Sequence, residues 1–358
     1  MISLVKPYVS DKDENAVRSY IKKVINGEET DNITEFENNF SKYLNVKYSR
    51  ALNSGSSALH LALLSLKVGD GDEVICSTHT CVAILNAIKY VGAKPILVDI
   101  KYSVIDMNFN IDERKIYKNI TNKTKVIIIP HMFGIPANIE EIKTYNIPII
   151  EDGTLSLGAK FISGDMVGSI GDISIFSLHR SKMISADAGG VIATNNQECI
   201  NEINNLLSYG TIQNYTVNYN YVMGEINSVL ANEQLSKINT FIKMREENAK
   251  KITKLLSENK NLKLPNINSS HVYFRYLLEL PEYITAEEVV KIGYERGVEF
   301  GRGVYPALHN YLGLERDLYA NSEKAQRKIV SIPVYPGLTD QDIKYICKVL
   351  LDIISEVK

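Results

Sequence analysis

Short apolar runs alternate with helical patterns from about residue 50 onward. Runs rich in β-branched residues, each bounded by polar residues, Gly or Pro, predict buried strands. These runs lie at residues 72–77, 94–100, 125–131, 146–152, 172–177 and 189–194. Residues 57–66 and 82–91, on either side of the first run, carry apolar side chains at helical spacing. Strands that alternate with helices in this way are typical of an α/β fold with a mostly parallel sheet.

The pattern changes after Tyr221, where residues 226–258 form one long helical stretch that is richer in charge. Such a stretch favours a helix that links two domains. The remainder mixes a strand pattern at 272–280 with a helical pattern at 286–297, which is typical of a smaller α+β unit. We therefore expect a large domain at residues 1–240 and a small C-terminal domain at 241–358.

Composition and charge exclude several classes of partner. The 358 residues include 40 Lys and Arg against 42 Asp and Glu, so no strong field attracts nucleic acid or an anionic membrane. The four cysteines, Cys76, Cys81, Cys199 and Cys347, form no CxxC pair. We expect no disulfide framework and no metal, which suits a reducing cytoplasm. The chain shows neither an apolar signal segment nor the roughly 18 apolar residues that a spanning helix needs, so we expect no membrane association.

Three polar groups follow predicted strands or precede helices, where α/β sheets bind ligands. Residues 53–57, Asn-Ser-Gly-Ser-Ser, precede a helix and would either hold a phosphate or simply cap that helix. Asp152 ends an apolar strand, where its carboxylate either meets a cation such as a pyridinium nitrogen or caps the next loop. Lys182 follows another strand, and is either solvated or a nucleophile with a lowered pKa.

Several fragments, in this order and spacing, resemble the DegT/StrS family of sugar aminotransferases. They include SGSSALHLALLSLKVGDGDEVI, IPIIEDGTLSLGAKF, GSIGDISIFSLHRSKMISADAGGVIAT and SIPVYPGLTDQDI. The resemblance covers nearly the whole chain. It implies the fold-type-I architecture of enzymes that use pyridoxal 5'-phosphate (PLP): a large domain with a mostly parallel seven-stranded sheet and a smaller α+β domain.

The resemblance also implies roles for individual residues. Lys182 would form the Schiff base with PLP and carry the proton, and Asp152 would pair with the pyridine nitrogen. Ser56, Ser57 and Ser177 would hold the phosphate.

Asn220 would reach the same phosphate from the partner subunit, so the family resemblance implies a homodimer with shared active sites. The implied substrates are an amino acid donor, usually L-glutamate, and a nucleotide-linked keto-sugar.

Some positions depart from the family pattern. Cys81 stands where an aromatic residue usually stacks on the cofactor, which leaves open whether Cys81, His79 or another side chain covers that face. Leu155 replaces a Gln or His, and Val222 replaces an Arg. Two alternatives to an aminotransferase therefore stay open: a PLP-dependent sugar dehydratase or lyase, against which Lys182 argues, and an inactive PLP-binding regulatory protein.

Two further residues are candidate substrate contacts. His309 and Arg302 could each reach a substrate, although these residue types more often are a partly buried His that satisfies local hydrogen bonds and a solvated Arg.

Overall fold

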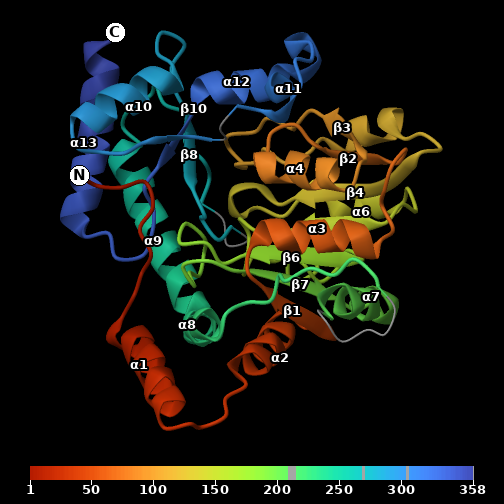
Figure 1. Cartoon of the computed structure of the whole chain (residues 1–358). Coiled ribbons are helices and arrows are strands. Elements are labelled where there is room, and N and C mark those ends of the chain that lie inside the picture. Colours follow the sequence, from red (N-terminus) through yellow and green to blue (C-terminus); the bar gives the residue numbers. More distant parts are fainter. Residues whose placement is uncertain (209–214, 268–270, 304–305, 358) are drawn as a thin grey trace.

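A seven-stranded sheet forms the centre of the larger part of the molecule (Figure 1). The structure is a computed structural model that describes residues 1–208, 215–267, 271–303 and 306–357. The strands are β1 (Tyr48–Leu52), β2 (Glu73–Ser77), β3 (Lys94–Val98), β4 (Thr124–Pro130), β5 (Ile149–Asp152), β6 (Ile173–Ser177) and β7 (Gly190–Thr194). Their order is β1-β7-β6-β5-β4-β2-β3, and only the pairs that include β7 are antiparallel. The predicted mostly parallel sheet is confirmed.

Helices cover both faces of this sheet. Side chains of β2 alternate between them: Val74 packs in the cluster that holds α3 (Gly55–Ser65) and α4 (Val82–Tyr90), whereas Ile75 packs with α6 (Ile139–Lys143). Because both faces are buried, the strands read as continuous apolar runs, which explains why their positions could be predicted. Three further helices of this part are α2 (Asn32–Leu44), α5 (Glu113–Ile116) and α7 (Gln197–Leu207).

Strand β1 was not predicted from the sequence. Its residues YSRAL include the partly exposed Tyr48 and Arg50, so the apolar run is interrupted. The strand lies at the sheet edge and is specified by its antiparallel pairing with β7, from Tyr48 opposite Thr194 to Leu52 opposite Gly190. That pairing brings together segments far apart in the sequence, which local periodicity does not encode.

The long helix predicted at 226–258 is two helices, α8 (Glu225–Ser236) and α9 (Ile238–Leu256). The chain turns at Lys237, whose ammonium lies 2.6 Å from Asp13 and 3.3 Å from Glu233. These ion pairs tie the turn to α1 (Asp11–Ile25), a contact that helical spacing alone does not reveal.

A three-stranded antiparallel sheet, ordered β8-β10-β9, forms the second part of the molecule. Its strands are β8 (Tyr276–Glu279), β9 (Gly301–Arg302) and β10 (Ile329–Ile332), and its helices are α10 (Ala286–Glu295), α11 (Leu308–Tyr311), α12 (Ala320–Lys328) and α13 (Asp340–Glu356). Short 3₁₀ helices lie at Tyr117–Asn119, Met132–Gly134 and Arg316–Tyr319. The α+β character predicted for the C-terminal region is present.

The domain limits 1–240 and 241–358 stay a prediction. Residue 240 falls inside α9, and Ile2 at the start of the chain bridges Val298 beside the small sheet. No helix in the described ranges is both long and apolar enough to cross a lipid bilayer.

Candidate cofactor and substrate site

A cavity of about 390 Å³ opens at the carboxyl edge of the large sheet. The strands β1, β5 and β6 run in the same direction, so the segments that follow them meet at this edge. The residues that line it are Asn53, Ser54, Gly55, Ser56, Leu59, Cys81, Ala83, Ile84, Asp152, Thr154, Ile175, Ser177, His179, Ser181, Lys182, Ala188 and Gly189. The cavity therefore gathers one amine, one carboxylate and several hydroxyls.

Lys182 reaches this cavity from the loop between β6 and β7. Its backbone N–H donates to the carbonyl of His179 at 2.8 Å, and its Nζ lies 5.7 Å from the centre of the Phe274 ring. Burial lowers the pKa of the Lys182 amine, and the nearby carboxylate of Asp152 opposes that shift. A lower pKa increases the neutral fraction of the amine, which is the form that attacks carbonyl groups.

Asp152 lies at the end of β5 and is only 6% exposed. Its Oδ1 accepts a hydrogen bond from the backbone N–H of Thr154 at 3.0 Å. A buried carboxylate needs a cation or hydrogen-bond donors nearby. Asp152 lines the same cavity as Lys182, and the cavity leaves space for a ligand beside it. This geometry suits a positively charged ring nitrogen held in the cavity.

The N-terminus of α3 forms another wall of the cavity. A Cβ on Gly190 would lie 2.3 Å from the carbonyl oxygen of Ser54, and a Cβ on Gly55 would lie 2.9 Å from Cβ of Ser177. Only glycine permits this close approach of the β1–α3 turn to the ends of β6 and β7. The backbone N–H groups of the first turn and the hydroxyls of Ser56 and Ser177 consequently lie around one end of the cavity, an arrangement suited to a phosphate.

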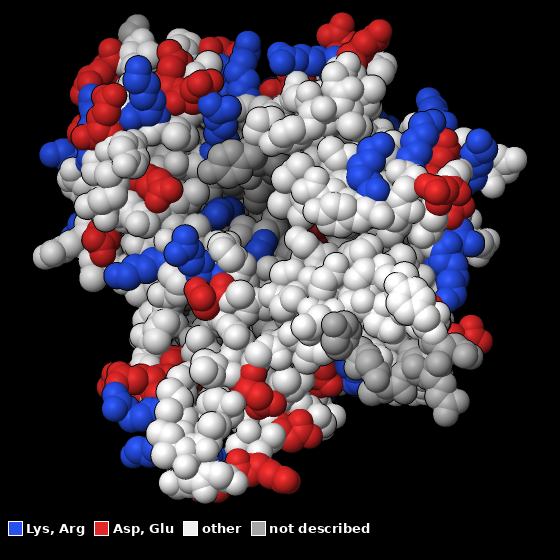
Figure 2. Space-filling view, viewed as in Figure 1, with Lys and Arg blue, Asp and Glu red and all other residues white. Residues whose placement is uncertain are grey.

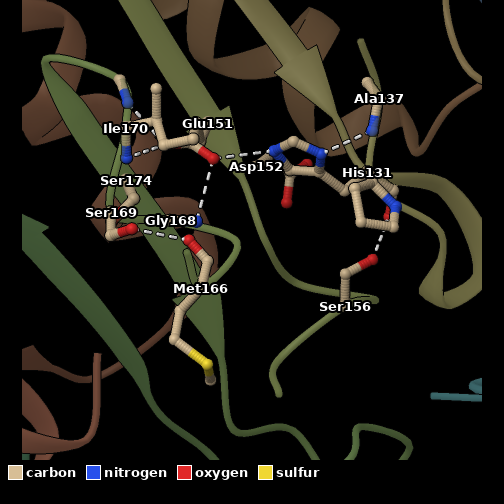
Figure 3. Close-up of polar contacts among 12 residues, drawn as sticks. His131, Ala137, Glu151, Asp152, Ser156, Met166, Gly168, Ser169, Ile170 and Ser174 are labelled. Carbon is tan, nitrogen blue, oxygen red and sulfur yellow. Dashed lines mark hydrogen bonds and ion pairs between the residues drawn. The ribbon is translucent and has the colours of Figure 1, made fainter. Parts of the chain in front are cut away.

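Behind Asp152, the neighbouring carboxylate Glu151 faces away from the cavity and holds a loop (Figure 3). Its Oε1 accepts from the N–H groups of Ile170 and Gly171 at 2.8 and 2.5 Å. Its Oε2 accepts from the N–H of Gly168 at 2.8 Å and lies 3.0 Å from Nε2 of His131. These bonds lower the pKa of Glu151, although burial alone would raise it.

His131 connects this network to the cavity wall. Its Nδ1 accepts from the N–H of Ala137 at 2.9 Å, so the neutral ring carries its proton on Nε2 and donates to Glu151. The backbone N–H of His131 donates to the carbonyl of Asp152 at 3.0 Å. The network thus fixes the backbone that carries the Asp152 carboxylate.

A second cavity, of about 570 Å³, adjoins the first at Cys81, Ser181 and Lys182. It extends to the C-terminal part of the chain, from which Phe274, Arg275, Glu299, Arg302 and Tyr311 also line it. Figure 2 shows Lys and Arg side chains gathered around the hollow between the two parts of the molecule. A ligand bound beside Lys182 could continue into this space.

A family model of the DegT/DnrJ/EryC1/StrS aminotransferases matches residues 8–351. The chain belongs to that family. It is 30% identical, over 369 residues, to a GDP-perosamine synthase of Escherichia coli, with 99% of each chain covered. It is also 30% identical, over 389 residues, to the UDP-4-amino-4,6-dideoxy-N-acetyl-beta-L-altrosamine transaminase of Campylobacter jejuni, covering 100% of this chain and 99% of that one.

Solved structures agree on the fold. An aminotransferase of Helicobacter pylori involved in the biosynthesis of pseudoaminic acid has a TM-score of 0.87 and 22% identity, with 99% of both chains covered. The family and the fold-type-I class predicted from the sequence are therefore confirmed, and with them the PLP-dependent aminotransferase class.

The first cavity fits PLP. The turn made possible by Gly55 and Gly190 would surround the phosphate, Asp152 would face the ring nitrogen, and Lys182 would reach the reactive carbon. The chain therefore carries the polar groups that the cofactor requires in one cavity.

Most of the predicted site residues lie together. Ser56, Ser177 and Cys81 line the first cavity with Asp152 and Lys182, whereas Ser57 does not. The Ser57 hydroxyl donates to Oδ1 of Asn53 at 2.6 Å, and its N–H donates to Ser54, so it stabilises the turn.

Cys81 lines both cavities, and its place beside the cofactor ring stays a prediction. His79 is buried and packs against Phe133 with a ring separation of 6.3 Å.

The two candidate substrate contacts differ in placement. Arg302 lines the second cavity and pairs with Glu287 at 3.0 Å. His309 is 0% exposed, with Nδ1 2.8 Å from the hydroxyl of Thr78 and Nε2 2.9 Å from Glu323. Both ring nitrogens of His309 therefore have protein partners, and its contact with a substrate stays a prediction.

Asn220 is exposed and does not line the cavity of its own chain. Its carbonyl lies 3.5 Å from Nδ2 of Asn53, at the rim of that cavity. A contact of its side chain with a partner's phosphate stays a prediction.

Arg275 and His131 were not identified from the sequence as parts of the site. Arg275 is the single cation inside the apolar pattern at 272–280, and a charge that interrupts a strand pattern is a usable signal. His131 ends a strand pattern at 125–131, but its bond to Glu151 joins segments that only the sheet brings together.

Proposed function

We propose that the chain is a PLP-dependent aminotransferase that moves an amino group from L-glutamate to a nucleotide-linked keto-sugar or a related cyclic ketone. The observation that carries this proposal is the amine of Lys182 in one cavity with the carboxylate of Asp152 and the first turn of α3. When bound, PLP supplies an electron sink for the electron pair left when a proton leaves the carbon that bears the amino group.

Residues of this chain bind the cofactor, orient it and transfer the proton. Lys182 bonds the cofactor and carries the proton between the reacting carbons, a task helped by its lowered pKa. Asp152 keeps a proton on the ring nitrogen by ionic pairing. Ser56, Ser177 and the N–H groups of α3 hold the phosphate, so that the ring stays oriented toward Lys182.

The proposed acceptor is nucleotide-linked because the relatives named above act in the synthesis of GDP- and UDP-linked amino sugars. The second cavity, which continues from Lys182 toward the small domain, offers the volume for such a substrate. A role in the biosynthesis of polysaccharides, in the cytoplasm where nucleotide sugars are made, follows from this substrate class.

One experiment tests the reaction. Enzyme loaded with PLP is mixed with L-glutamate, and the visible absorption of the cofactor and the release of 2-oxoglutarate are measured. GDP- and UDP-linked keto-sugars are then added, and amination is read by mass spectrometry. The Lys182→Ala enzyme should release no 2-oxoglutarate, and borohydride should no longer attach the cofactor to the protein. Turnover to a dehydrated sugar without 2-oxoglutarate, or no reaction with any donor, would contradict the proposal.

We also propose a homodimer in which Asn220 of each chain completes the site of the other. The segment that carries Asn220 is held at the cavity rim, where the N–H of Asn53 donates to the carbonyl of Tyr221 at 2.7 Å. Next to it, Tyr219 and Tyr221 stack at 5.2 Å, and Val222 is exposed, which leaves apolar surface for a second copy.

Mixed dimers test this arrangement. If Asn220→Ala and Lys182→Ala chains are each impaired, half of the randomly reassorted dimers are mixed, and each has one intact site. About a quarter of the wild-type activity should return. No recovery after verified subunit exchange would mean that Asn220 does not serve the partner's site.

A further inference from the structure

Basic side chains outnumber carboxylates in the lining of the second cavity. Among the residues that line it, Lys182, Arg275 and Arg302 are cationic, and Glu299 is the carboxylate. An oxygen of Glu299 already accepts a hydrogen bond from the N–H of Leu4 at 3.1 Å. Arg302 pairs with Glu287 at 3.0 Å, and Arg275 is the candidate for contact with an anionic ligand.

Arg275 and Lys182 both lie near the ring of Phe274. The Cζ of Arg275 lies 4.7 Å from the centre of the Phe274 ring, and Nζ of Lys182 lies 5.7 Å from the same point. The two cationic groups are consequently within about 10 Å of each other. A small molecule that reacts beside Lys182 can reach Arg275 with its far end.

A second guanidinium, that of Arg245, bonds the backbone next to Arg275. Arg245 is buried, and its Nη1 donates to the carbonyls of Tyr273 and Phe274 at 3.2 and 3.4 Å, while its Nε has no hydrogen-bond partner among the residues that the structure describes. Burial, and secondly the charge of Arg275, lower the pKa of Arg245 to about 9. Two guanidinium groups close enough to disfavour each other's charge make a region that an anion would stabilise.

We propose that Arg275 binds the side-chain carboxylate of a dicarboxylic amino donor while the α-carbon of that donor lies beside Lys182. This inference rests on the proposed function and deepens it by assigning the donor subsite. A guanidinium holds a carboxylate through two parallel hydrogen bonds, which gives it both affinity and orientation. The diphosphate of a nucleotide-linked acceptor is separated from its keto carbon by a sugar ring, so its place is farther out, toward Arg302.

Binding of glutarate tests the subsite without any reaction. Glutarate has the two carboxylates of the donor and no amine, and its affinity for the PLP-loaded enzyme is measured by calorimetry. The Arg275→Gln enzyme should bind glutarate about 10- to 100-fold more weakly, because charge-assisted hydrogen bonds are lost. The control is Arg327→Gln, which removes an arginine of the small domain that pairs with Glu282 outside this cavity. It should leave the affinity unchanged.

The half-reaction with amino acids gives a second measurement. In the Arg275→Gln enzyme, the kcat/KM for L-glutamate should fall by about 10- to 100-fold, while that for L-alanine, which lacks the side-chain carboxylate, should stay within about twofold. Arg275→Lys keeps the charge but not the planar fork, so it should give an intermediate loss even if the Gln variant does not fold.

Unchanged glutarate affinity, or an equal loss for glutamate and alanine, would overturn the assignment of Arg275. A wild-type enzyme that binds glutarate through Arg275 but releases no 2-oxoglutarate from glutamate would instead overturn the proposed function. The two failures are therefore distinguishable.

Discussion

Replacing Glu151 by Gln should destabilise the protein strongly, although the two side chains have nearly the same shape. The carboxylate accepts four hydrogen bonds, from Gly168, Ile170, Gly171 and His131. An amide offers one oxygen, so its NH₂ group would face either the two donors at Oε1 or the two at Oε2. His131 cannot adapt by moving its proton, because its Nδ1 accepts from Ala137.

At least two buried donors thus lose their acceptor, at about 1–3 kcal/mol each, and we expect a total of about 3–5 kcal/mol. For a chain of this length, such a loss corresponds to a fall in Tm of roughly 4–7 °C. Thermal unfolding by circular dichroism measures it. The matched control is Glu140→Gln, because Glu140 is exposed on the nearby helix α6 and should change stability by no more than about 0.5 kcal/mol.

The difference in stability between the wild type and the Glu151→Gln variant should depend on pH in a defined direction. Because the pKa of Glu151 is lowered in the folded protein, its stabilisation is present above its ordinary value of 4.5 and is lost as the pH falls through the lower folded pKa. The gap between wild type and variant should therefore narrow below pH 4.5. A variant as stable as the Glu140 control at pH 7 would refute the argued role of Glu151.

Two further substitutions test the roles of Asp152 and His79. Asp152→Asn should keep the cofactor, measured by its absorption, but lose about 100-fold or more of the rate, because an amide cannot hold the ring proton; near-normal turnover would remove Asp152 from the site. Burial lowers the pKa of His79 to about 4 from 6.5. Between these pH values the unfolded chain binds a proton that the folded protein does not bind. The free energy of unfolding therefore decreases as the pH is lowered from 6.5 to 4, by up to about 3 kcal/mol. His79→Gln should show a shallower loss of Tm from pH 6.5 to 4.5, and a slope equal to that of wild type would contradict this reasoning.

Several residues that line the first cavity could be predicted from the sequence because their signals are local. Asp152 ends one apolar strand pattern and Lys182 lies in the loop after another, and β5 and β6 form where those patterns predict them. A strand buried on both faces must be apolar throughout, so a polar residue at its end is conspicuous even in one sequence. The family resemblance then supplied roles that periodicity does not contain.

The tertiary structure decided the features that depend on contacts between distant segments. It placed β1 at the sheet edge, turned the hydroxyl of Ser57 toward Asn53, and buried His309 between Thr78 and Glu323. It also brought Arg275 to the ring that Lys182 faces, across more than ninety residues of chain. Hydrogen bonds and charges act through space, so the side chains that complete a site are set by how the elements pack, whereas the elements themselves follow from the local alternation of apolar and polar residues.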